Sequence, residues 1–204
     1  MNILQYAPGR HRETGCGSLS LSSNSTKLLE TTSSDRSFST KTSNVRYENI
    51  NIATQNIRTL SCDIKLANSI QEAKNLNLDV LALQEVRRHG NGTLELDSGD
   101  TRGWQFVWSG FKRKSEAGVA FILAPHVKLI ESHFHYDARI LSVRVIIYGL
   151  CLTLTCSYAP TNCNTDSSKT LFYRELRKAN SNMLKFNRFK SINLGDFNAT
   201  IGMD

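Results

Sequence analysis

Hydrophobic and polar positions follow two periods along the chain, and each period predicts a different kind of element. Alternation over residues 49–54 predicts a strand that ends near Asn56. Helical spacing predicts an amphipathic helix over residues 62–77. The uninterrupted apolar run within residues 79–85 predicts a strand buried on both faces, with Glu85 at the point where the strand emerges. A polar, glycine-bearing loop is predicted after this strand.

The middle of the chain is dominated by predicted strands. Short apolar segments predict them at residues 104–108, 118–124, 127–131, 140–147 and 150–157, and helical spacing returns over residues 169–187. A strand, a helix and a strand followed by many consecutive strands predict a mixed α/β layered fold in which helices cover a sheet.

Each predicted helix has one apolar face. In the first helix this face consists of Ile64, Ala67, Ile70 and Ala73, and in the second of Phe172, Leu176, Ala179 and Met183. The other side of the second helix carries Arg174, Arg177, Lys178, Lys185 and Arg188. Such a basic face can contact a phosphate backbone, but a solvated outer face is the interpretation that we favour.

The first 48 residues differ in composition from the rest. Ser and Thr dominate residues 15–44, and bulky apolar residues are few. A segment of this kind cannot bury enough apolar surface to offset its ordering entropy. We therefore expect residues 1–48 to form a disordered tail, and we favour this over a transit peptide because Glu13, Glu30 and Asp35 interrupt the segment. The folded domain is predicted at residues 49–204.

Charge and cysteine content narrow the class of protein. The 204 residues include 25 Lys and Arg and 18 Asp and Glu, a net charge of +7 that favours polyanionic partners such as DNA. The five cysteines form no Cys-x-x-Cys pair, which indicates reduced thiols. Because the N-terminus lacks the apolar core of a signal peptide and no run is long enough to cross a membrane, we expect a soluble nuclear or cytoplasmic protein without membrane partners.

Polar side chains recur where predicted strands end. Asn56, Glu85 and Tyr158 each stand at such a position, and Asp196 and Asn198 follow the apolar run 192–194. If this last segment stays extended, Asp196 and Asn198 point the same way, because side chains two apart share a face. Carboxylates and amides at converging strand ends can form one site for phosphodiester hydrolysis, in which Mg²⁺ takes one or two carboxylates.

Two other interpretations stay open at this point. Glu85 can instead be a strand-end carboxylate that pairs with Arg87 or Arg88. Asp196 and Asn198, next to a glycine, can form a solvated turn, because Asp and Asn side chains bond to their own backbone in turns.

The order of these motifs resembles a known superfamily. The motifs are Asn56 after a strand, Leu83-Gln84-Glu85, Ser109-Gly110 with Lys112-Arg113-Lys114 ahead of Ala117-Gly118-Val119-Ala120, Tyr158-Ala159-Pro160, and Gly195-Asp196-Phe197-Asn198-Ala199. From about residue 50 onward the chain resembles the endonuclease/exonuclease/phosphatase superfamily. Within it, the chain is most similar to the apurinic-type endonuclease domain of non-LTR retrotransposons and the related craniofacial development protein 2-like sequences. The resemblance implies an α/β fold, a two-layer β-sandwich flanked by helices and incomplete at the C-terminus.

The resemblance also implies a role for each matching residue. Glu85 would hold a divalent metal, Mg²⁺ or alternatively Mn²⁺, and Asn56 would assist on the side of the metal and nucleophile. Tyr158 would contact the scissile phosphate. Asp196 would orient or deprotonate the attacking water, and Asn198 would stabilise the phosphate as charge builds.

The implied function is Mg²⁺-dependent nicking of DNA by attack of water on a phosphodiester. Lys112, Arg113 and Lys114 stand where the resembled endonucleases approach DNA, with a solvated turn as an equal alternative. The superfamily's later motifs, a further metal-side Asp and a C-terminal Asp-His pair, have no counterpart in this sequence, so we expect weak or absent catalysis. The alternatives are a truncated, non-catalytic nucleic-acid-binding remnant and a phosphoesterase that acts on a phospholipid or inositol phosphate.

Overall fold

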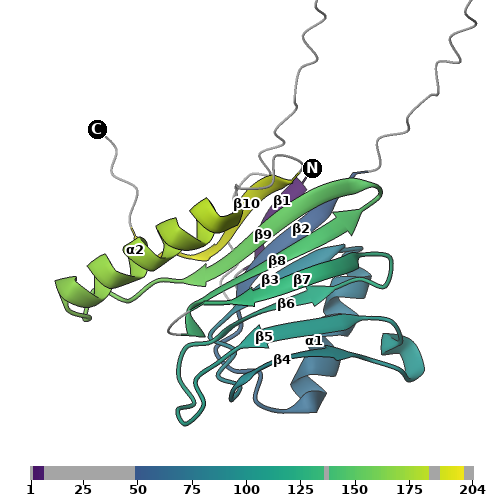
Figure 1. Cartoon of the computed structure of the whole chain (residues 1–204). Helices are drawn as coiled ribbons and strands as arrows, with labels where there is room; N and C mark the ends of the chain where they lie inside the picture. Colours follow the sequence, from purple (N-terminus) through teal and green to yellow (C-terminus); the bar gives the residue numbers. More distant parts are fainter. Residues whose placement is uncertain (1, 7–48, 136–137, 184–188, 200–204) are drawn as a thin grey trace, which may run out of the picture.

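The protein is a sandwich of two β-sheets with helices on its flanks (Figure 1). The computed structural model describes residues 2–6, 49–135, 138–183 and 189–199. Within that part of the chain no helix is long and apolar enough to cross a membrane. The two-layer sandwich confirms the predicted fold class.

Within the described residues, the larger sheet has six strands and the smaller sheet four. In spatial order, the six strands are β1 (Asn2–Tyr6), β2 (Asn51–Asn56), β3 (Val80–Gln84), β6 (Val119–Leu123), β5 (Gln105–Ser109) and β4 (Asn91–Glu95). The four strands of the smaller sheet are β10 (Lys190–Asp196), β9 (Leu150–Tyr158), β8 (Ile140–Ile147) and β7 (Lys128–Phe134). The helical elements are α1 (Asp63–Asn75), the 3₁₀ turn η1 (Gly99–Thr101) and α2 (Asp166–Met183).

The core lies between the two sheets. Every residue of β3 and β6 is buried, which fits their continuous apolar sequences. A buried polar link crosses the core, where Gln84 Nε2 of the larger sheet donates to Cys156 Sγ of the smaller sheet at 3.2 Å. The same amide nitrogen donates to Thr54 Oγ1 at 2.9 Å, so the polar group has partners within its apolar surroundings. This link lies one residue before Glu85 and therefore fixes the end of β3 relative to β9.

The apolar face of α1 differs from the prediction. Leu66, Ser69, Ile70 and Ala73 are buried, whereas Ile64 and Ala67 are exposed. Leu66, Ile70 and Ala73 stand at i, i+4 and i+7, which is an equally regular helical stripe rotated from the predicted one. The sequence contains both stripes, and only packing on the sheet selects between them.

The buried face of α2 agrees with the prediction where its side chains are described. Phe172, Leu176 and Ala179 are buried and pack in one cluster with Ile140 of β8 and with Ala159 just after β9. Met183 belongs to the predicted face, but its side chain lies outside the described residues, as do Lys185 and Arg188 of the basic face.

Two strands lie where none was predicted. β1 pairs in parallel with β2 from Asn2 opposite Asn51 to Tyr6 opposite Gln55, so the prediction of a disordered tail is wrong for these five residues. Residues 7–48, the rest of the predicted tail, lie outside the described residues. β4 lies within the predicted loop, and its residues are mostly exposed. Both are edge strands held by backbone pairing with one neighbour, and such pairing leaves little hydrophobic pattern in the sequence.

Candidate active site at the strand ends

Two parallel strand pairs bring the candidate residues to one end of the sandwich. In the larger sheet, Asn56 at the end of β2 is opposite Gln84, so Glu85 emerges from β3 beside Asn56. In the smaller sheet, Tyr158 at the end of β9 is opposite Asp196 at the end of β10. The carboxyl ends of parallel strands share one edge of a sheet, so each sheet presents one pair of polar residues there. β10 also contacts β2 and β3 across the sandwich, which brings the two pairs together.

Hydrogen bonds join these pairs across the sheets into one group of four residues, which we call the strand-end cluster: Asn56, Glu85, Tyr158 and Asp196. Asn56 Nδ2 donates to Glu85 Oε1 at 2.9 Å and to Asp196 Oδ2 at 3.2 Å. The Tyr158 hydroxyl donates to Glu85 Oε1 at 3.0 Å. The amide of Asn56 thus bridges two carboxylates, which separates their negative charges.

The backbone after β3 turns sharply to aim Glu85 into this cluster. Glu85 has φ 55° and Arg87 φ 53°, both in the left-handed region that non-glycine residues seldom adopt. Two backbone bonds hold the turn, from Val86 N to the Gly118 carbonyl at 3.1 Å and from Arg87 N to the Ala117 carbonyl at 2.8 Å. Residues in such conformations persist only where their surroundings fix them, and they concentrate at functional sites.

Gly195 allows β10 to lie against β9 directly before Asp196. Its φ is 146°, and a Cβ at this position would collide with the Ser157 carbonyl of β9. After the glycine, the Asp196 carbonyl accepts a hydrogen bond from Ala159 N at 2.8 Å. The glycine of the Gly-Asp-Phe-Asn motif therefore has a packing role, because it allows the backbone approach that places the Asp196 side chain.

Asn198 takes a different orientation from the predicted one. The chain does not stay extended after Asp196, since Asn198 has φ 45° and its N–H donates to Asp196 Oδ1 at 3.0 Å. Its side-chain Nδ2 donates to the Ala159 carbonyl at 2.7 Å. The predicted same-face arrangement is therefore wrong, and an Asx-type turn forms instead because the aspartate side chain bonds to the backbone two residues on. Asn198 lies against Asp196, and the described contacts do not join it to Glu85 or Asn56.

Arg87 pairs with Glu85, which was the alternative interpretation of that carboxylate. Arg87 NH2 lies 2.7 Å from Glu85 Oε2, on the oxygen that Asn56 and Tyr158 do not use. Arg88 points elsewhere, with its NH2 3.0 Å from Asp63 Oδ1 and its guanidinium over the rings of Phe106 and Trp108. One oxygen of Glu85 thus faces the cluster and the other faces Arg87, which confirms the ion pair and leaves the role of Glu85 in a metal site as a prediction.

The partners of Glu85 determine its ionisation. Burial raises the pKa of the Glu85 carboxyl, but the hydrogen bonds from Asn56, Arg87 and Tyr158, together with the charge of Arg87, more than offset burial and lower the pKa below its ordinary value. Burial, the hydrogen bond to Glu85 and its negative charge raise the pKa of the Tyr158 hydroxyl. At neutral pH Glu85 is therefore an anion and Tyr158 a neutral donor.

Arg139 is a site neighbour that no sequence signal indicated. Its guanidinium carbon lies 5.3 Å from the centre of the Tyr158 ring, and its NH1 lies 3.4 Å from the Tyr158 carbonyl. Arg139 directly precedes β8, and its own carbonyl accepts the Tyr158 N–H at 2.9 Å. The pairing of β8 with β9 thus places a positive charge beside the cluster.

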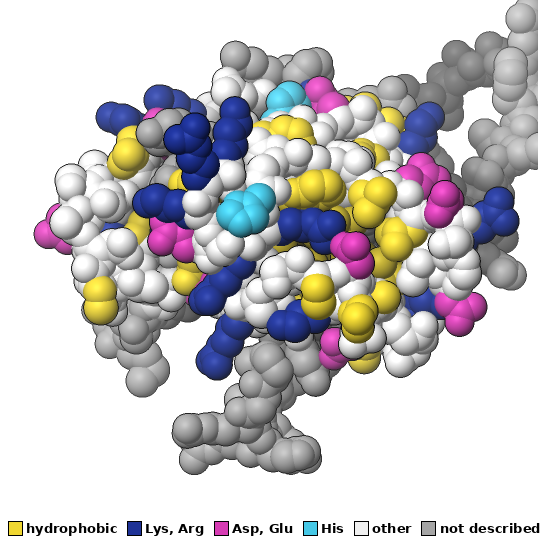
Figure 2. Space-filling view, turned by 90° about the horizontal axis from the view of Figure 1, so that it is seen from below, with side chains coloured by type: hydrophobic (Ala, Val, Ile, Leu, Met, Phe, Trp, Pro, Cys, Tyr) yellow, Lys and Arg dark blue, Asp and Glu magenta, His cyan; other side chains and the backbone are white. Residues whose placement is uncertain are grey.

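The predicted DNA-contact residues lie in the loop between β5 and β6. Lys112, Arg113 and Lys114 are exposed, and Lys114 Nζ lies 3.3 Å from Glu116 Oε1. No described contact joins the three residues to the strand-end cluster. In the space-filling view of Figure 2, dark blue Lys and Arg side chains gather through the middle of the face, which fits the net charge of +7.

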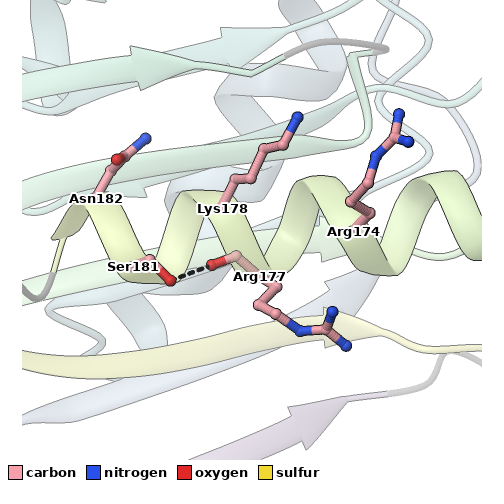
Figure 3. A pocket seen from close by; sticks show the side chains of 5 residues that line it. All are labelled: Arg174, Arg177, Lys178, Ser181 and Asn182. Carbon is pink, nitrogen blue, oxygen red and sulfur yellow. Dashed lines mark hydrogen bonds between the residues drawn. The ribbon is translucent and has the colours of Figure 1, made fainter.

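The exposed side of α2 forms a second basic surface. Two surface hollows of about 350 and 550 Å³ lie along this helix, and both are lined by Arg174 and Arg177. Figure 3 shows Arg174 and Lys178 pointing to one side of the helix and Arg177 to the other. Glu175 Oε1 lies 3.5 Å from Arg174 Nε and 2.8 Å from Lys178 Nζ, so the Glu175 carboxylate compensates part of the positive charge. Residues of the strand-end cluster line neither hollow.

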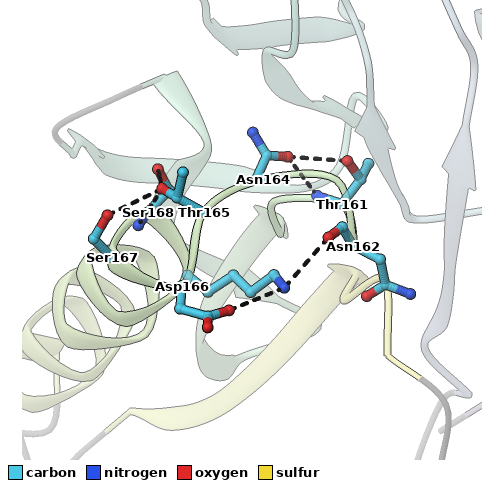
Figure 4. Close-up of polar contacts among 8 residues, drawn as sticks. Thr161, Asn162, Asn164, Thr165, Asp166, Ser167 and Ser168 are labelled. Carbon is cyan, nitrogen blue, oxygen red and sulfur yellow. Dashed lines mark hydrogen bonds and ion pairs between the residues drawn. The ribbon is translucent and has the colours of Figure 1, made fainter.

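A hydrogen-bonded loop connects the cluster to α2 (Figure 4). Asn164 Oδ1 accepts from both the N–H and the hydroxyl of Thr161 at 2.9 Å, which closes the turn after Pro160. Thr165 Oγ1 then accepts the Ser168 N–H at 3.3 Å at the start of α2. These bonds fix the path of the chain on the Tyr158 side of the site.

The oxygen donors of the cluster suit a hard divalent cation. Glu85 and Asp196 contribute two carboxylates that share one amide donor, Asn56 Nδ2. Among the described residues, no group of three or more His, Cys, Asp and Glu side chains could hold a metal ion. Mg²⁺ commonly binds one or two carboxylates and keeps water at its other positions, so a pair is sufficient.

Comparison with known proteins identifies the fold. No protein-family model and no curated protein sequence matches the chain. The structure of a humanised D. rerio TDP2 aligns with a TM-score of 0.52 at 18% identity, over 74% of this chain and 67% of that one. The human nocturnin catalytic domain aligns with a TM-score of 0.52 at 16% identity, over 74% and 64%.

An AP endonuclease from Archaeoglobus fulgidus aligns with a TM-score of 0.51 at 21% identity, over 72% of this chain and 56% of that one. The chain thus spans between 56% and 67% of the length of these three structures. All three are members of one superfamily, the one that the order of the sequence motifs resembles. The chain has the fold of the endonuclease/exonuclease/phosphatase superfamily.

Proposed function

We propose that this chain is a divalent-cation-dependent phosphodiesterase domain of the retrotransposon endonuclease type, and that its substrate is DNA. The observation that carries the proposal is the strand-end cluster, in which hydrogen bonds link four polar residues at the ends of four strands, two in each sheet. A structural ion pair needs only two groups. Two carboxylates, an amide and a phenol that converge on one half-buried edge can supply the cation ligand, the base and the donors that phosphodiester hydrolysis uses.

Glu85 is the proposed ligand of Mg²⁺ or Mn²⁺, with Asn56 on the same side. A bound cation would neutralise the negative charge of the phosphate and of the oxygen that leaves it. Glu85 suits this role because its lowered pKa keeps it ionised at neutral pH. Asn56 holds the Glu85 carboxylate in position and keeps it apart from the Asp196 carboxylate.

Asp196 is the proposed base. It accepts a proton from a water molecule, whose oxygen forms a bond to phosphorus while the bond from phosphorus to the leaving oxygen breaks. Solvent returns a proton to the leaving oxygen. Tyr158 would exchange its hydrogen bond to Glu85 for one to a phosphate oxygen, since its raised pKa keeps it protonated. Asn198, which lies against Asp196, is the proposed support for the charged phosphate. Each residue thus contributes to positioning or proton transfer.

Basic side chains around the cluster favour DNA over a neutral substrate. Arg87 and Arg139 lie beside the cluster, and the exposed Lys112, Arg113 and Lys114 are the proposed contacts to the DNA backbone. One similar structure is of D. rerio TDP2 complexed with a single-strand DNA product. Replacing the three loop residues by Ala should lower affinity for DNA of any sequence. The slope of log K against log salt should fall by about 1 for each phosphate that the variant no longer neutralises.

Nicking of supercoiled plasmid tests the proposal. Intact and depurinated plasmids are incubated with the purified chain in Mg²⁺ and in EDTA, beside Glu85→Gln and Asp196→Asn variants. The control is Glu95→Gln, the same chemical change on β4, outside the strand-end cluster. We expect slow nicking that depends on the metal, that the two cluster variants lose and that the control keeps. Loss of one proton-transfer group should slow the reaction about 10²- to 10⁴-fold.

Other outcomes would replace the proposal with one of its rivals. Salt-sensitive DNA binding without cleavage in any divalent metal would identify a non-catalytic nucleic-acid-binding remnant. Hydrolysis of an inositol phosphate that competes with DNA would change the substrate class. Nicking that survives both cluster substitutions would show that the catalytic residues are wrongly assigned.

A further inference from the structure

Arg87 contacts the Glu85 oxygen to which Asn56 and Tyr158 do not donate. Asn56 and Tyr158 both donate to Oε1, whereas Oε2 has Arg87 NH2 as its described partner, at 2.7 Å. The Glu85 side chain is 16% exposed and that of Arg87 is 45% exposed. A cation that approaches Glu85 from solvent therefore meets a guanidinium already bound to the carboxylate.

The backbone holds Arg87 in this place. Both Glu85 and Arg87 adopt left-handed φ values, and Arg87 N donates to the Ala117 carbonyl at 2.8 Å. Gly118 lies directly against this turn, where an added Cβ would lie 3.2 Å from Arg87 N. In an extended continuation of β3 the two side chains would also lie on one face of the sheet. The turn instead fixes the direction of each side chain. The ion pair is thus a product of a constrained local fold.

We propose that Arg87 is a positioning residue that competes with the divalent cation for Glu85, so that cation binding requires release of the Arg87 guanidinium. This inference rests on the proposed function, because it takes Glu85 as the metal ligand. Without the cation, Arg87 compensates the charge of Glu85 and keeps the carboxylate aligned with Asn56 and Tyr158. When the cation binds, Arg87 becomes available to an anion on the same side of the site, and a phosphate-bearing ligand is an anion of that kind.

Competition predicts that removing Arg87 strengthens cation binding, which is the opposite of what loss of a supporting residue would do. Two effects act in the same direction in Arg87→Ala. The carboxylate oxygen loses its competing partner, and the unit positive charge that repels the cation disappears. Surface ion pairs are weak and salt screens them, so we expect affinity to rise about three- to tenfold at low ionic strength.

Mn²⁺ affinity measured by electron paramagnetic resonance of the free ion tests this inference without reference to catalysis. The full chain is compared with Arg87→Ala, Arg87→Lys and Arg88→Ala at pH 7.5 in low salt, with folding checked by circular dichroism. Arg88→Ala is the matched control, because it removes the same charge from the next residue, whose guanidinium contacts Asp63 instead. Arg87→Ala should bind Mn²⁺ about three- to tenfold more tightly, Arg88→Ala should match the unaltered chain within about twofold, and Arg87→Lys should fall between them.

A second measurement follows Arg87 itself. Arginine side-chain ¹H–¹⁵N spectra of the unaltered chain should show the Arg87 Nε resonance shifting on addition of diamagnetic Mg²⁺, with no shift in the Glu85→Gln variant. Equal or weaker Mn²⁺ binding by Arg87→Ala would overturn the inference while leaving the proposed function standing, provided that Glu85→Gln abolishes binding. Mn²⁺ binding that Glu85→Gln leaves intact, or no binding by any variant, would overturn both.

Discussion

Asn56 is the residue whose loss should disturb the strand-end cluster most. Its amide nitrogen donates to Glu85 Oε1 at the end of the larger sheet and to Asp196 Oδ2 in the smaller sheet, at 2.9 and 3.2 Å. Asn56→Ala removes both bonds and leaves two carboxylates without the donor that they share. We expect a loss of folding stability that comes from the junction between the sheets, with little change in secondary structure.

The size of the stability loss in Asn56→Ala follows from the charge of the two acceptors. A hydrogen bond to a charged group contributes roughly 1.5 to 3 kcal/mol. Asn56 is half-buried at the surface end of the sandwich, so the lower limit applies to each of the two bonds that it donates to a carboxylate. Asn56→Ala should therefore lower the free energy of unfolding by about 3 kcal/mol at pH 7.

The effect should depend on pH in a defined direction. Although burial raises the pKa of Glu85, the bonds from Asn56, Arg87 and Tyr158 lower it below its ordinary value of 4.5. A depressed carboxyl pKa stabilises the fold above the unfolded-state pKa, and this contribution is lost as the pH falls through the folded-state pKa. The destabilisation by Asn56→Ala should thus be largest at neutral pH and should shrink below about pH 4.5.

Urea unfolding followed by circular dichroism measures these differences at pH 7 and at pH 3.5. Asn68→Ala on the exposed face of α1 is the control for loss of an asparagine, and it should change stability by less than about 0.5 kcal/mol. A double-mutant cycle of Asn56→Ala with Asp196→Ala should show coupling of at least about 0.5 kcal/mol. A destabilisation below about 1 kcal/mol, or additive effects in the cycle, would refute the argument that the amide joins the two sheets.

Three further predictions follow from other features of the structure. Burial raises the pKa of the Cys156 thiol to about 12. Iodoacetamide at pH 8 should therefore label the exposed Cys62 and leave Cys156 unlabelled until the protein unfolds, and peptide mass mapping measures both. Burial and the bond to Glu85 raise the pKa of the Tyr158 hydroxyl above its ordinary value of 10. The ultraviolet titration of the unaltered chain minus that of Tyr158→Phe should therefore show a phenol that ionises above pH 10. A midpoint at or below that pH would contradict the hydrogen bond to Glu85. Gly195→Ala should destabilise the fold by about 2 kcal/mol or more in urea unfolding, because a Cβ there collides with the Ser157 carbonyl at a positive φ.

The sequence by itself determined the elements whose pattern results from burial. β8 has the predicted bounds, and β3, β6 and β9 lie within a residue or two of theirs, because long apolar segments in the core allow few alternatives. The motif order identified the strand ends on which Asn56, Glu85, Tyr158 and Asp196 stand. These are local properties, since each depends on a residue's position within its own strand.

Elements with little buried surface depended on their neighbours. The edge strands β1 and β4 form by backbone pairing, which carries no side-chain signature. The buried stripe of α1 contains Leu66 in place of Ile64, because both stripes have helical spacing and only contact with the sheet distinguishes them. The orientation of Asn198 likewise followed from a hydrogen bond to the Asp196 side chain that replaced the extended backbone.

Only the tertiary structure decided which polar groups meet. Asn56 and Asp196 are 140 residues apart in the chain, and their contact exists because two sheets stack with the ends of β2 and β10 on the same side. The pairing of β8 with β9 places Arg139 beside Tyr158, and the turn after β3 places Arg87 on the Oε2 atom of Glu85. A sequence specifies the chemical groups and the strands that carry them, whereas distances between groups on different sheets arise from packing, which depends on the whole core at once.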